Sequence, residues 1–441
     1  GDAVGPWYEA ALPGREAFCM RDVSHQSSGA AVLGLEEETR NMLFRFAENI
    51  AETRDWCSYW EITKDNEPAP VDYENDQDFW YNLPANFDVM DACFRMYLWT
   101  GDSSYILDPV FLNFYEKTLN EYTSRWDLHA ATILERKRKM NLPGDATEEN
   151  HRFYLNRGIP GYHEGAAGRM LLGIDQLAVQ FAANAGYNQV IMNAEPNTRW
   201  ENEAEILASI INTVFWDDEN KKFRIILYDD RSFSYDVDSG QDFSHSLLHY
   251  NVLNDTEKIN SILERYISSS EKPIIEIASH LPDIYFRYGQ PEEGVKMLKY
   301  LADENTPRRE YPENPFSIAG AYATGLMGIT ADARSNHIIT YSGITDPETW
   351  ATLSGLPVMG KSIDLFHYGR HTSVITNHSA ETIYWFPHLE GAREQWFING
   401  KPDRTHARLR ELFGDQVSSW MIPVAPRSTA SVSAFPNTPR E

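Results

Sequence analysis

A helical period runs through most of the first 330 residues. Apolar side chains recur at every third or fourth position, which is the spacing of an amphipathic helix; in 171–182 only Asp175 breaks the apolar face. Glycine followed by acidic residues, as from Gly34 to Glu36, marks the end of one helix and the start of the next. These signals predict about eleven helices, with starts near residues 22, 36, 83, 103, 166, 199, 242, 255, 276, 291 and 315.

Two segments interrupt the helical pattern. Residues 127–165 contain a basic stretch at 135–140 and then a glycine- and proline-rich sequence that is too irregular to be all helix. Residues 223–236 have the composition and turn signals of a short β-hairpin.

Strand-like alternation replaces the helical period after about residue 336. β-branched and aromatic residues alternate with polar ones between turn signals, as in 336–344 and 372–389. We therefore expect an all-β region of about 100 residues, long enough for a small β-sandwich. The predicted domains are a helical domain, 1–335, and a C-terminal β domain, 336–441.

A series of paired helices joined by turns is compatible with two architectures. One is an open solenoid of repeated hairpins, and the other is a closed ring of six hairpins, the (α/α)6 toroid. A solenoid keeps its repeats alike, whereas the segments here differ and their connecting loops are long and unequal. The sequence thus favours a mainly α chain, an (α/α)6 toroid followed by a small β-sandwich, with a twelfth helix either missed or upstream.

Charge narrows the range of partners. The formal net charge is −26, so nucleic acid and anionic membrane surfaces would be repelled, and a highly sulfated polymer is disfavoured for the same reason. No apolar run approaches the roughly 20 residues of a membrane span, so none is predicted. Because the chain begins with Gly1 rather than Met, we expect that a signal peptide has been removed and that the protein is secreted or periplasmic.

Cofactor motifs are absent from the sequence. The three cysteines suggest neither a disulfide framework nor a metal-binding spacing. Phosphate-binding, zinc-helix and nucleophile-elbow motifs are missing as well. We therefore predict no cofactor and no metal.

Aromatic residues are abundant, with 12 Trp, 23 Tyr and 21 Phe. They could simply form a large core. The alternative is a carbohydrate cleft, in which flat rings stack on sugar faces while carboxylates bind hydroxyl groups.

A first candidate site lies in the segment "RDVSHQ" at 21–26, where Arg21, Asp22 and His25 precede an apolar helix. Asp22 could cap that helix. Alternatively, the Arg21 guanidinium would donate to one sugar hydroxyl while Asp22 accepts from its neighbour.

A second candidate lies at 72–81, where four acids, Asp76 among them, run into Phe79, Trp80 and Tyr81. Such a charge run is usually a solvated loop. Three consecutive aromatic residues are hard to bury in one short segment, however, so a loop that faces substrate through Asp76 and Trp80 is equally compatible.

Glu164 is a candidate general acid. It follows Tyr162 and His163 at the end of a glycine-rich loop, just before a predicted helix. Its negative charge could merely favour that helix N-terminus. As a catalytic acid it would instead have to keep its proton through partial burial among aromatic rings.

A last candidate is the segment "RREYPENPF" at 308–316, a cluster of charges that runs into an apolar helix. Glu310 could pair with a basic neighbour, and the cluster could be a helix cap exposed to solvent. Glu313 lies between Pro312 and Pro315, which would hold its backbone in place, as a catalytic carboxylate requires.

Together these segments resemble the six-hairpin glycosidases, the glucoamylase-like α/α-toroid hydrolases, and in particular a branch from polysaccharide-degrading bacteria. The resemblance rests on "RDVSHQ", "FWYNLPANFD" at 79–88, "GYHEG" at 161–165 and "YPENP" with "GLMGI" at 311–329. It covers most of the chain and does not identify a sugar. One departure is that His163 precedes Glu164, where the family often has two adjacent glutamates.

The resemblance implies a hydrolase of an oligosaccharide or polysaccharide that inverts the anomeric configuration. We expect exo action, although the sequence itself does not decide between exo and endo cleavage. Arg21 and Asp22 would bind the terminal sugar, with His25, Tyr162 and His163 nearby. Glu164 would be the general acid, and a carboxylate near the last hairpin would activate water. Glu313 matches that base best and Glu310 second; the two carboxyl groups should lie about 6.5–9.5 Å apart.

Two other functions remain open from the residues alone. A polysaccharide lyase acting on a uronate-containing glycan would need a Tyr or His base beside a cation, and Tyr162, His163, Arg21 and His25 could serve. A non-catalytic glycan-binding protein would need only the aromatic residues.

Overall fold

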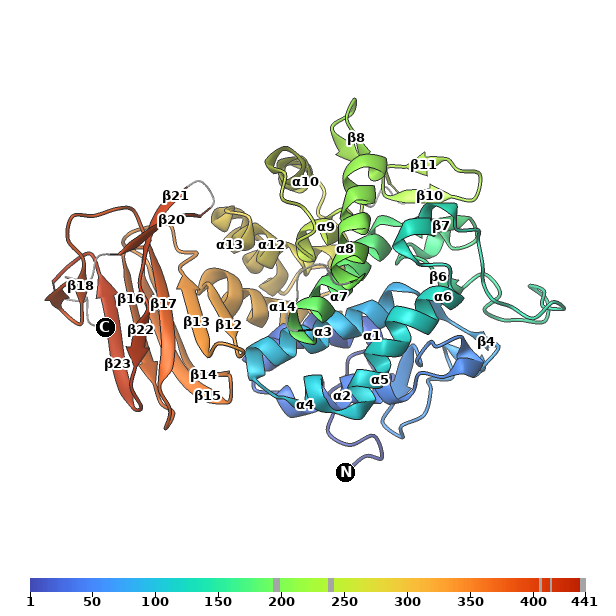
Figure 1. Ribbon diagram of the computed structural model, residues 1–441, viewed down its shortest axis with the longest axis horizontal. Helices are drawn as coiled ribbons and strands as arrows, with labels where there is room; N and C mark the ends of the chain where they lie inside the picture. Colours follow the sequence, from blue (N-terminus) through green and yellow to red (C-terminus); the bar gives the residue numbers. More distant parts are fainter. Residues whose placement is uncertain (193–198, 237–241, 404–406, 413–414, 437–441) are drawn as a thin grey trace.

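The computed structural model describes residues 1–192, 199–236, 242–403, 407–412 and 415–436. Helices are the main elements up to Leu326, with short strands between them, and strands are the main elements after it, as the periodicity predicted (Figure 1). None of the described helices is long and apolar enough to cross a lipid bilayer.

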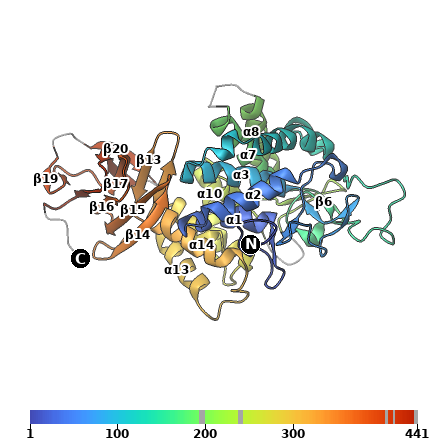
Figure 2. The same ribbon diagram turned by 90° about the horizontal axis from the view of Figure 1, so that it is seen from below.

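Six helices follow one another in a closed circuit of contacts. Each packs against the next, and the last packs against the first. In this order they are α1 (Met20–Val32), α3 (Pro84–Thr100), α7 (Ile174–Val190), α9 (His245–His249), α12 (Leu281–Arg287) and α14 (Glu313–Ala321). Figure 2 shows α1 between α3 and α14. Side chains from all six helices can therefore meet inside the circuit.

Further helices cover this circuit. α2 packs on α1 and α3, α8 on α7, and α13 on α12 and α14, while α5 packs on α2. Their bounds are α2 (Glu36–Glu48), α5 (Pro109–Lys117), α8 (Arg199–Ile210), α10 (Thr256–Ser268) and α13 (Pro291–Ala302), with the short helices α4 (Ser104–Leu107), α6 (Thr123–Arg125) and α11 (Ile275–Ala278) between them.

Local sequence explains where helices begin and end. Pro84 occupies the first turn of α3, where its missing N–H costs nothing. The helix ends at Gly101, whose φ of 74° is the left-handed conformation that glycine adopts without strain. Gly29 matters for packing instead. A Cβ built on it would lie 1.9 Å from the carbonyl oxygen of Phe316, so only glycine lets α1 and α14 come this close.

One predicted helix start is wrong. The segment after Glu164 makes a single turn, 164–166, and then a strand, β7 (Met170–Gly173), so that α7 begins only at Ile174. β7 pairs with β10 (Ile226–Tyr228) of the predicted hairpin, which β11 (Phe233–Ser234) completes. This pairing partner is distant in sequence, and local signals cannot reveal it. Glu164 therefore begins a single 3-10 turn and not an α-helix.

The charged cluster before α14 also differs from the prediction. Arg308, Arg309 and Glu310 are exposed, as expected. Glu313 is instead the first residue of α14, and its exposed fraction is 0%. The start of the helix turns this side chain inward, toward the centre of the circuit.

The C-terminal strands form two six-stranded sheets. The first has the order β12–β13–β17–β21–β20 with β22 also paired to β17, and the second has the order β14–β15–β16–β23–β18–β19. β16 contacts β17 and β22 contacts β23, so the sheets lie against each other.

The strand bounds of the first sheet are β12 (Ile329–Asp332), β13 (His337–Tyr341), β17 (Ile383–Glu390), β20 (Arg408–Leu412), β21 (Asp415–Ser419) and β22 (Ile422–Val424). Those of the second are β14 (Trp350–Val358), β15 (Lys361–Tyr368), β16 (Thr372–Asn377), β18 (Phe397–Ile398), β19 (Lys401–Pro402) and β23 (Ser428–Ser433). The predicted domain boundary falls in the turn between β12 and β13.

The end of α3 joins the helices to the sheets. The Trp99 indole N–H donates to the carbonyl of Pro357 (3.1 Å), and the Met359 N–H donates to the carbonyl of Trp99 (2.7 Å). The Ala333 N–H donates to the carbonyl of Leu98 (3.0 Å).

Candidate functional site

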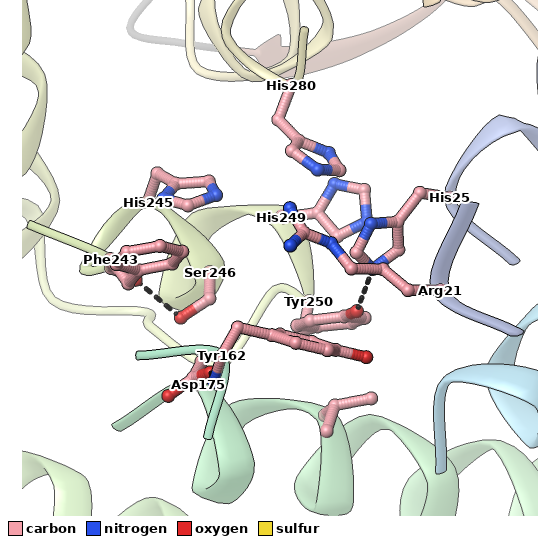
Figure 3. Close-up of a pocket in the computed structure, with 11 residues that line it drawn as sticks. Arg21, His25, Tyr162, Asp175, Phe243, His245, Ser246, His249, Tyr250 and His280 are labelled. Atoms are coloured by element: carbon pink, nitrogen blue, oxygen red, sulfur yellow. Dashed lines mark hydrogen bonds between the residues drawn. The ribbon is translucent and has the colours of Figure 1, made fainter. Parts of the chain in front are cut away.

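A small cavity lies inside the helical circuit (Figure 3). The space open to the centre of a water molecule is 20 Å³, enough for about one water. Helices α1, α7 and α9 and the loops before α7 and α12 supply its walls. Imidazole and phenol rings and one guanidinium dominate the lining: Arg21, His25, Tyr162, His245, His249, Tyr250 and His280.

Glu313 lies behind the rings of His25 and His280. Its Oε1 is 3.1 Å from His25 Nδ1 and 3.6 Å from Arg21 Nε. Its Oε2 accepts a long hydrogen bond from the Ser279 hydroxyl (3.4 Å) and lies 3.7 Å from His280 Nε2. Cationic and polar groups from two segments, α1 and residues 279–280, thus surround a fully buried carboxylate, as a buried charge requires.

Asp88 is a second buried carboxylate, on α3. Its exposed fraction is 1%, and it accepts hydrogen bonds from the hydroxyls of Tyr162 and Tyr250. His25 Nε2 lies 3.4 Å from Oδ1 of the same group. The imidazole of His25 is therefore held between Asp88 on one side and Glu313 on the other.

These carboxylates control the charge of His25. Burial alone would lower the pKa of the imidazole, but Glu313 and Asp88 outweigh it and raise the pKa to about 9. His25 is thus an imidazolium at neutral pH. Burial and the charge of Glu313 raise the pKa of Asp22 to about 7, although the Arg21 guanidinium acts against them.

The other histidines of the cavity are neutral. Burial, helped by the charge of Arg21, lowers the pKa of His163 and of His245 to about 3. Burial also lowers the pKa of His249 and of His280 well below the usual range. The His163 ring also packs edge-on against the Phe243 ring, with 4.2 Å between the ring centroids.

Glu164 is exposed and does not line the cavity, although it follows the lining residue Tyr162 by two positions. Partial burial raises the pKa of its carboxyl, Glu276 raises it further, and the Arg21 guanidinium lowers it. Arg21 thus influences both Glu164 and Glu313. Its guanidinium also lies over the Tyr162 ring, 4.6 Å from the centroid.

The structure brings together six of the residues singled out in the sequence. Arg21, Asp22, His25, Tyr162, His163 and Glu313 all lie in or against the cavity. Glu313 and Glu164 come close enough to Arg21 to be affected by its charge.

Three predicted residues lie elsewhere. Asp76 pairs with Arg54 (2.8 Å) and accepts from the hydroxyls of Tyr73 (2.6 Å) and Thr53 (2.5 Å). The Trp80 indole donates to Asn82 (2.9 Å), and its ring packs on Phe153. Glu310 is exposed on the loop before α14. None of the three lines the cavity.

Sequence reasoning missed several residues of the site, chiefly Asp88, Asp175, His245, His249 and His280. Asp175 accepts a hydrogen bond from the Tyr162 N–H (2.7 Å), and burial raises the pKa of Asp175 to about 6. A signal did exist for the two aspartates, because each interrupts an apolar helix face, and a buried carboxylate needs partners. For the histidines, a core role was the simpler interpretation.

A metal could in principle lie beside Glu313. His25, His280 and Glu313 are the one group of three His, Cys, Asp or Glu side chains in the described chain whose ligand atoms all lie within 4.8 Å of one another. A cation there would face the Arg21 guanidinium, 3.6 Å from the same carboxylate, and would have to displace the contact between His25 and Glu313. Hydrogen bonds and ion pairs therefore account for the cluster better.

Comparison with known proteins gives structural matches. No protein-family model and no curated protein sequence matches the chain. An α-L-rhamnosidase from Dictyoglumus thermophilum superposes with a TM-score of 0.55 at 11% identity, over 94% of this chain and 45% of that one. A protein from the human microbiome, provisionally named a kojibiose phosphorylase, gives 0.48 at 9% identity, over 96% and 59%. A cellobiose 2-epimerase from Bacillus thermoamylovorans B4167 gives 0.40 at 9%, over 70% and 89%.

The chain thus spans about half the length of the first two proteins, 45% and 59%. At 11% identity a match of this kind concerns the fold and not the activity. The resemblance noted in the sequence is confirmed at that level: the chain shares its fold with the α-L-rhamnosidase.

Proposed function

We propose that the protein is a glycoside hydrolase that removes terminal sugars from an oligosaccharide or polysaccharide with inversion of configuration. The observation that carries this proposal is the pairing of Glu313 with Arg21 at the centre of the helical circuit. A second carboxyl, Glu164, has a raised pKa and lies on the loop that also supplies Tyr162. Two carboxyl groups with different surroundings are what acid and base catalysis requires.

The chemistry would follow a single displacement. Glu164 would donate its proton to the leaving glycosidic oxygen, while Glu313 removes a proton from the water that attacks the anomeric carbon from the opposite face. The Arg21 and Asp22 side chains would hold adjacent hydroxyls of the terminal sugar. The Tyr162 ring would offer a flat surface to the sugar.

The size of the cavity bears on how the substrate binds. Room for about one water suits the attacking water but not a sugar ring, so the sugar would bind toward solvent from the cavity, beside Glu164. A closed end behind the first sugar favours action at a chain terminus over cleavage within a chain. Exo action therefore belongs to the proposal.

The architecture supports the same proposal. The six helices in a closed circuit, with outer helices packed on them, fit an (α/α)6 toroid with its site at the centre. We propose the domain limits 1–335 and 336–441 and a β-sandwich for the second domain. The expected location, secreted or periplasmic, and sugar contacts from Asp76 and Trp80 remain predictions.

A lyase is less well supported. Elimination would need a tyrosine or histidine with a pKa close to the working pH. Burial and Asp88 instead raise the pKa of the Tyr162 and Tyr250 hydroxyls well above their usual range. Burial lowers the pKa of His163 to about 3, which makes it a weak base.

The test is a product assay on a panel of plant and algal oligosaccharides with the wild type, Glu164→Gln, Glu313→Gln and Glu310→Gln. We expect a saturated monosaccharide whose first-formed anomer, observed by ¹H NMR, is opposite to the substrate linkage. Removing either proposed group should lower kcat by roughly 10²–10⁴-fold. Glu310→Gln is the matched control, since Glu310 is exposed on the loop three residues before Glu313, and it should change kcat less than about twofold.

Other outcomes would contradict the proposal. An unsaturated product that survives both substitutions would indicate a lyase. Saccharide binding without any product, unchanged in Glu164→Gln, would indicate a glycan-binding protein.

A further inference from the structure

Asp88 receives three polar contacts from three separate parts of the helical domain. Tyr162 on the loop before α7 and Tyr250 directly after α9 donate their hydroxyls to it, and His25 on α1 places Nε2 3.4 Å from Oδ1. Carboxylate oxygens can accept about four hydrogen bonds, so one aspartate can satisfy all three donors. All three of these partners line the cavity, which has room for about one water.

One branch of this network leads to Glu313. His25 uses Nε2 toward Asp88 and Nδ1 toward Oε1 of Glu313, at 3.1 Å. A histidine with both nitrogens engaged cannot rotate without losing one partner. Asp88 therefore restricts the orientation of the imidazole, and the imidazole restricts Glu313.

The other branch leads to the loop of Glu164. Tyr162 is anchored at both ends, because its hydroxyl donates to Asp88 while its backbone N–H donates to Asp175 (2.7 Å). Glu164 follows two residues later. The Tyr162 ring also stacks against the Arg21 guanidinium, which in turn lies 3.6 Å from Glu313.

We propose that Asp88 is a positioning residue that couples the two glutamates, holding Glu313 through His25 and the loop of Glu164 through Tyr162. The role of the glutamates rests on the function proposed above; the hydrogen-bonded link stands on the contacts themselves. Asp88 acts only through its neighbours and does not touch the substrate. Its removal should therefore disturb the reaction step more than substrate binding.

The substitution that tests this role is Asp88→Asn, which keeps the shape of the side chain. An amide has one acceptor oxygen instead of two and carries no charge, so it cannot accept from both tyrosines and His25 together. His25 Nε2 would lose its carboxylate partner and keep only the Tyr250 hydroxyl, 3.3 Å away, while Glu313 would remain the charged group in contact with Nδ1. A misplacement of about 1 Å in a catalytic group can lower the rate by about 100-fold.

The experiment uses the full chain and four proteins: wild type, Asp88→Asn, Tyr250→Phe and Asp91→Asn. Asp91 is the matched control, because it lies on the same helix, pairs with Arg95 at 2.7 Å and has no contact with His25 among the described interactions. For Asp88→Asn we expect kcat to fall roughly 10–100-fold with KM within about threefold. Tyr250→Phe keeps the charge and removes one donor, so its kcat should fall by less; Asp91→Asn should stay within about twofold of the wild type.

A second measurement does not need a substrate. In ¹⁵N-histidine NMR spectra, with the His25 signals assigned from His25→Gln, both ring nitrogens of His25 should change in Asp88→Asn and not in Asp91→Asn. Circular dichroism and thermal melting show whether each variant is folded. If Asp88→Asn does not fold, Tyr250→Phe provides the test, with a smaller change in the same signals.

The outcomes separate the two proposals. Unchanged kcat and unchanged His25 signals in folded Asp88→Asn would overturn the positioning role. A rise in KM alone would overturn it as well, because that would place Asp88 in substrate binding. If the wild type cleaves no saccharide, the proposed function fails, and the His25 signals still decide whether Asp88 holds the network.

Discussion

At the residue scale, burial and a few charges determine which groups around the cavity carry protons. The proposed acid must be protonated to act, so activity is lost as the pH rises through its pKa. Burial raises the pKa of Glu164, and the negative charge of Glu276 adds to that effect. Glu276 itself is paired with Arg308 at 2.5 Å, outside the cavity lining.

Glu276→Gln should therefore move the alkaline limb of the kcat/KM profile to lower pH. The substitution removes a charge that favours the protonated form of Glu164 and leaves the Glu164 carboxyl in place. The measurement is kcat/KM from pH 4 to 9 for both proteins. An alkaline limb that stays where it is, or moves upward, would show that Glu164 is not the group that limits activity there.

Buried neutral histidines predict a stability that depends on pH. Burial lowers the pKa of His245 to about 3 in the folded protein, below the value of about 6.5 in an unfolded chain. The unfolded state then binds the extra proton first, so the free energy of unfolding falls as the pH drops from about 6.5 toward 3. The slope for one such group is at most about 1.4 kcal/mol per pH unit.

His245→Gln should flatten this dependence, because a glutamine stays neutral at every pH. Asp22 and Asp175, with raised pKa values, change stability in the opposite direction, so the difference between variant and wild type isolates the histidine. Urea unfolding at pH 7.0, 5.5 and 4.5 measures the free energy of unfolding of each protein. Replacing His151, a half-buried residue outside the cavity, by Gln is the control and should leave the slope unchanged; equal slopes for all three proteins would contradict the prediction.

At the element scale, the contact between α1 and α14 brings Arg21 and His25 to Glu313. The contact depends on Gly29, since any Cβ there would collide with the backbone of Phe316 at 1.9 Å and could not be relieved by a rotamer change. Gly29→Ala must then push the two helices apart. Overpacking of this kind costs roughly 1–3 kcal/mol.

Gly29→Ala should lower both the free energy of unfolding and kcat, because it moves His25 and Glu313 relative to each other. Gly144→Ala is the control: a Cβ there has nothing within 4 Å, so the variant should match the wild type. Urea unfolding measures the stability, and kcat is measured on a saccharide that the wild type cleaves in the product assay. Wild-type stability in Gly29→Ala would show that the helices separate at little cost.

At the scale of the whole molecule, the last turn of α3 ties the helices to the β sheets. Trp99 both donates to Pro357 and accepts from Met359, and Leu98 accepts from Ala333. Because α3 also carries Asp88, the strands stabilise a helix that supports the site. We expect one cooperative calorimetric transition for the full chain, whereas two separate transitions would show that the sheets unfold independently of the helices.

Periodicity predicted much of the fold. The starts of five helices could be predicted from glycine, proline and acidic residues at the helix boundary: α2, α3, α8, α10 and α13. These signals act within a few residues of the boundary. The strand-rich C-terminal region follows from alternation. β7 was missed, since its partner β10 lies more than 50 residues away and local sequence carries no trace of that pairing.

For the site, too, local sequence predicted some of the residues and the tertiary structure revealed the others. Arg21, Glu164 and Glu313 could be named in the sequence because charged residues beside helix starts and proline-bounded loops are recognisable there. The sequence alone determined that these residues were present, that the first domain was helical and that strands came last, because such features depend on neighbours along the chain. Only the tertiary structure decided that Glu313 is buried against His25, that Asp88 joins two tyrosines to that histidine, and that Asp76 and Trp80 lie apart. Burial and pairing depend on groups brought together from distant positions, and these contacts, rather than residue type, set the charge and orientation of each side chain.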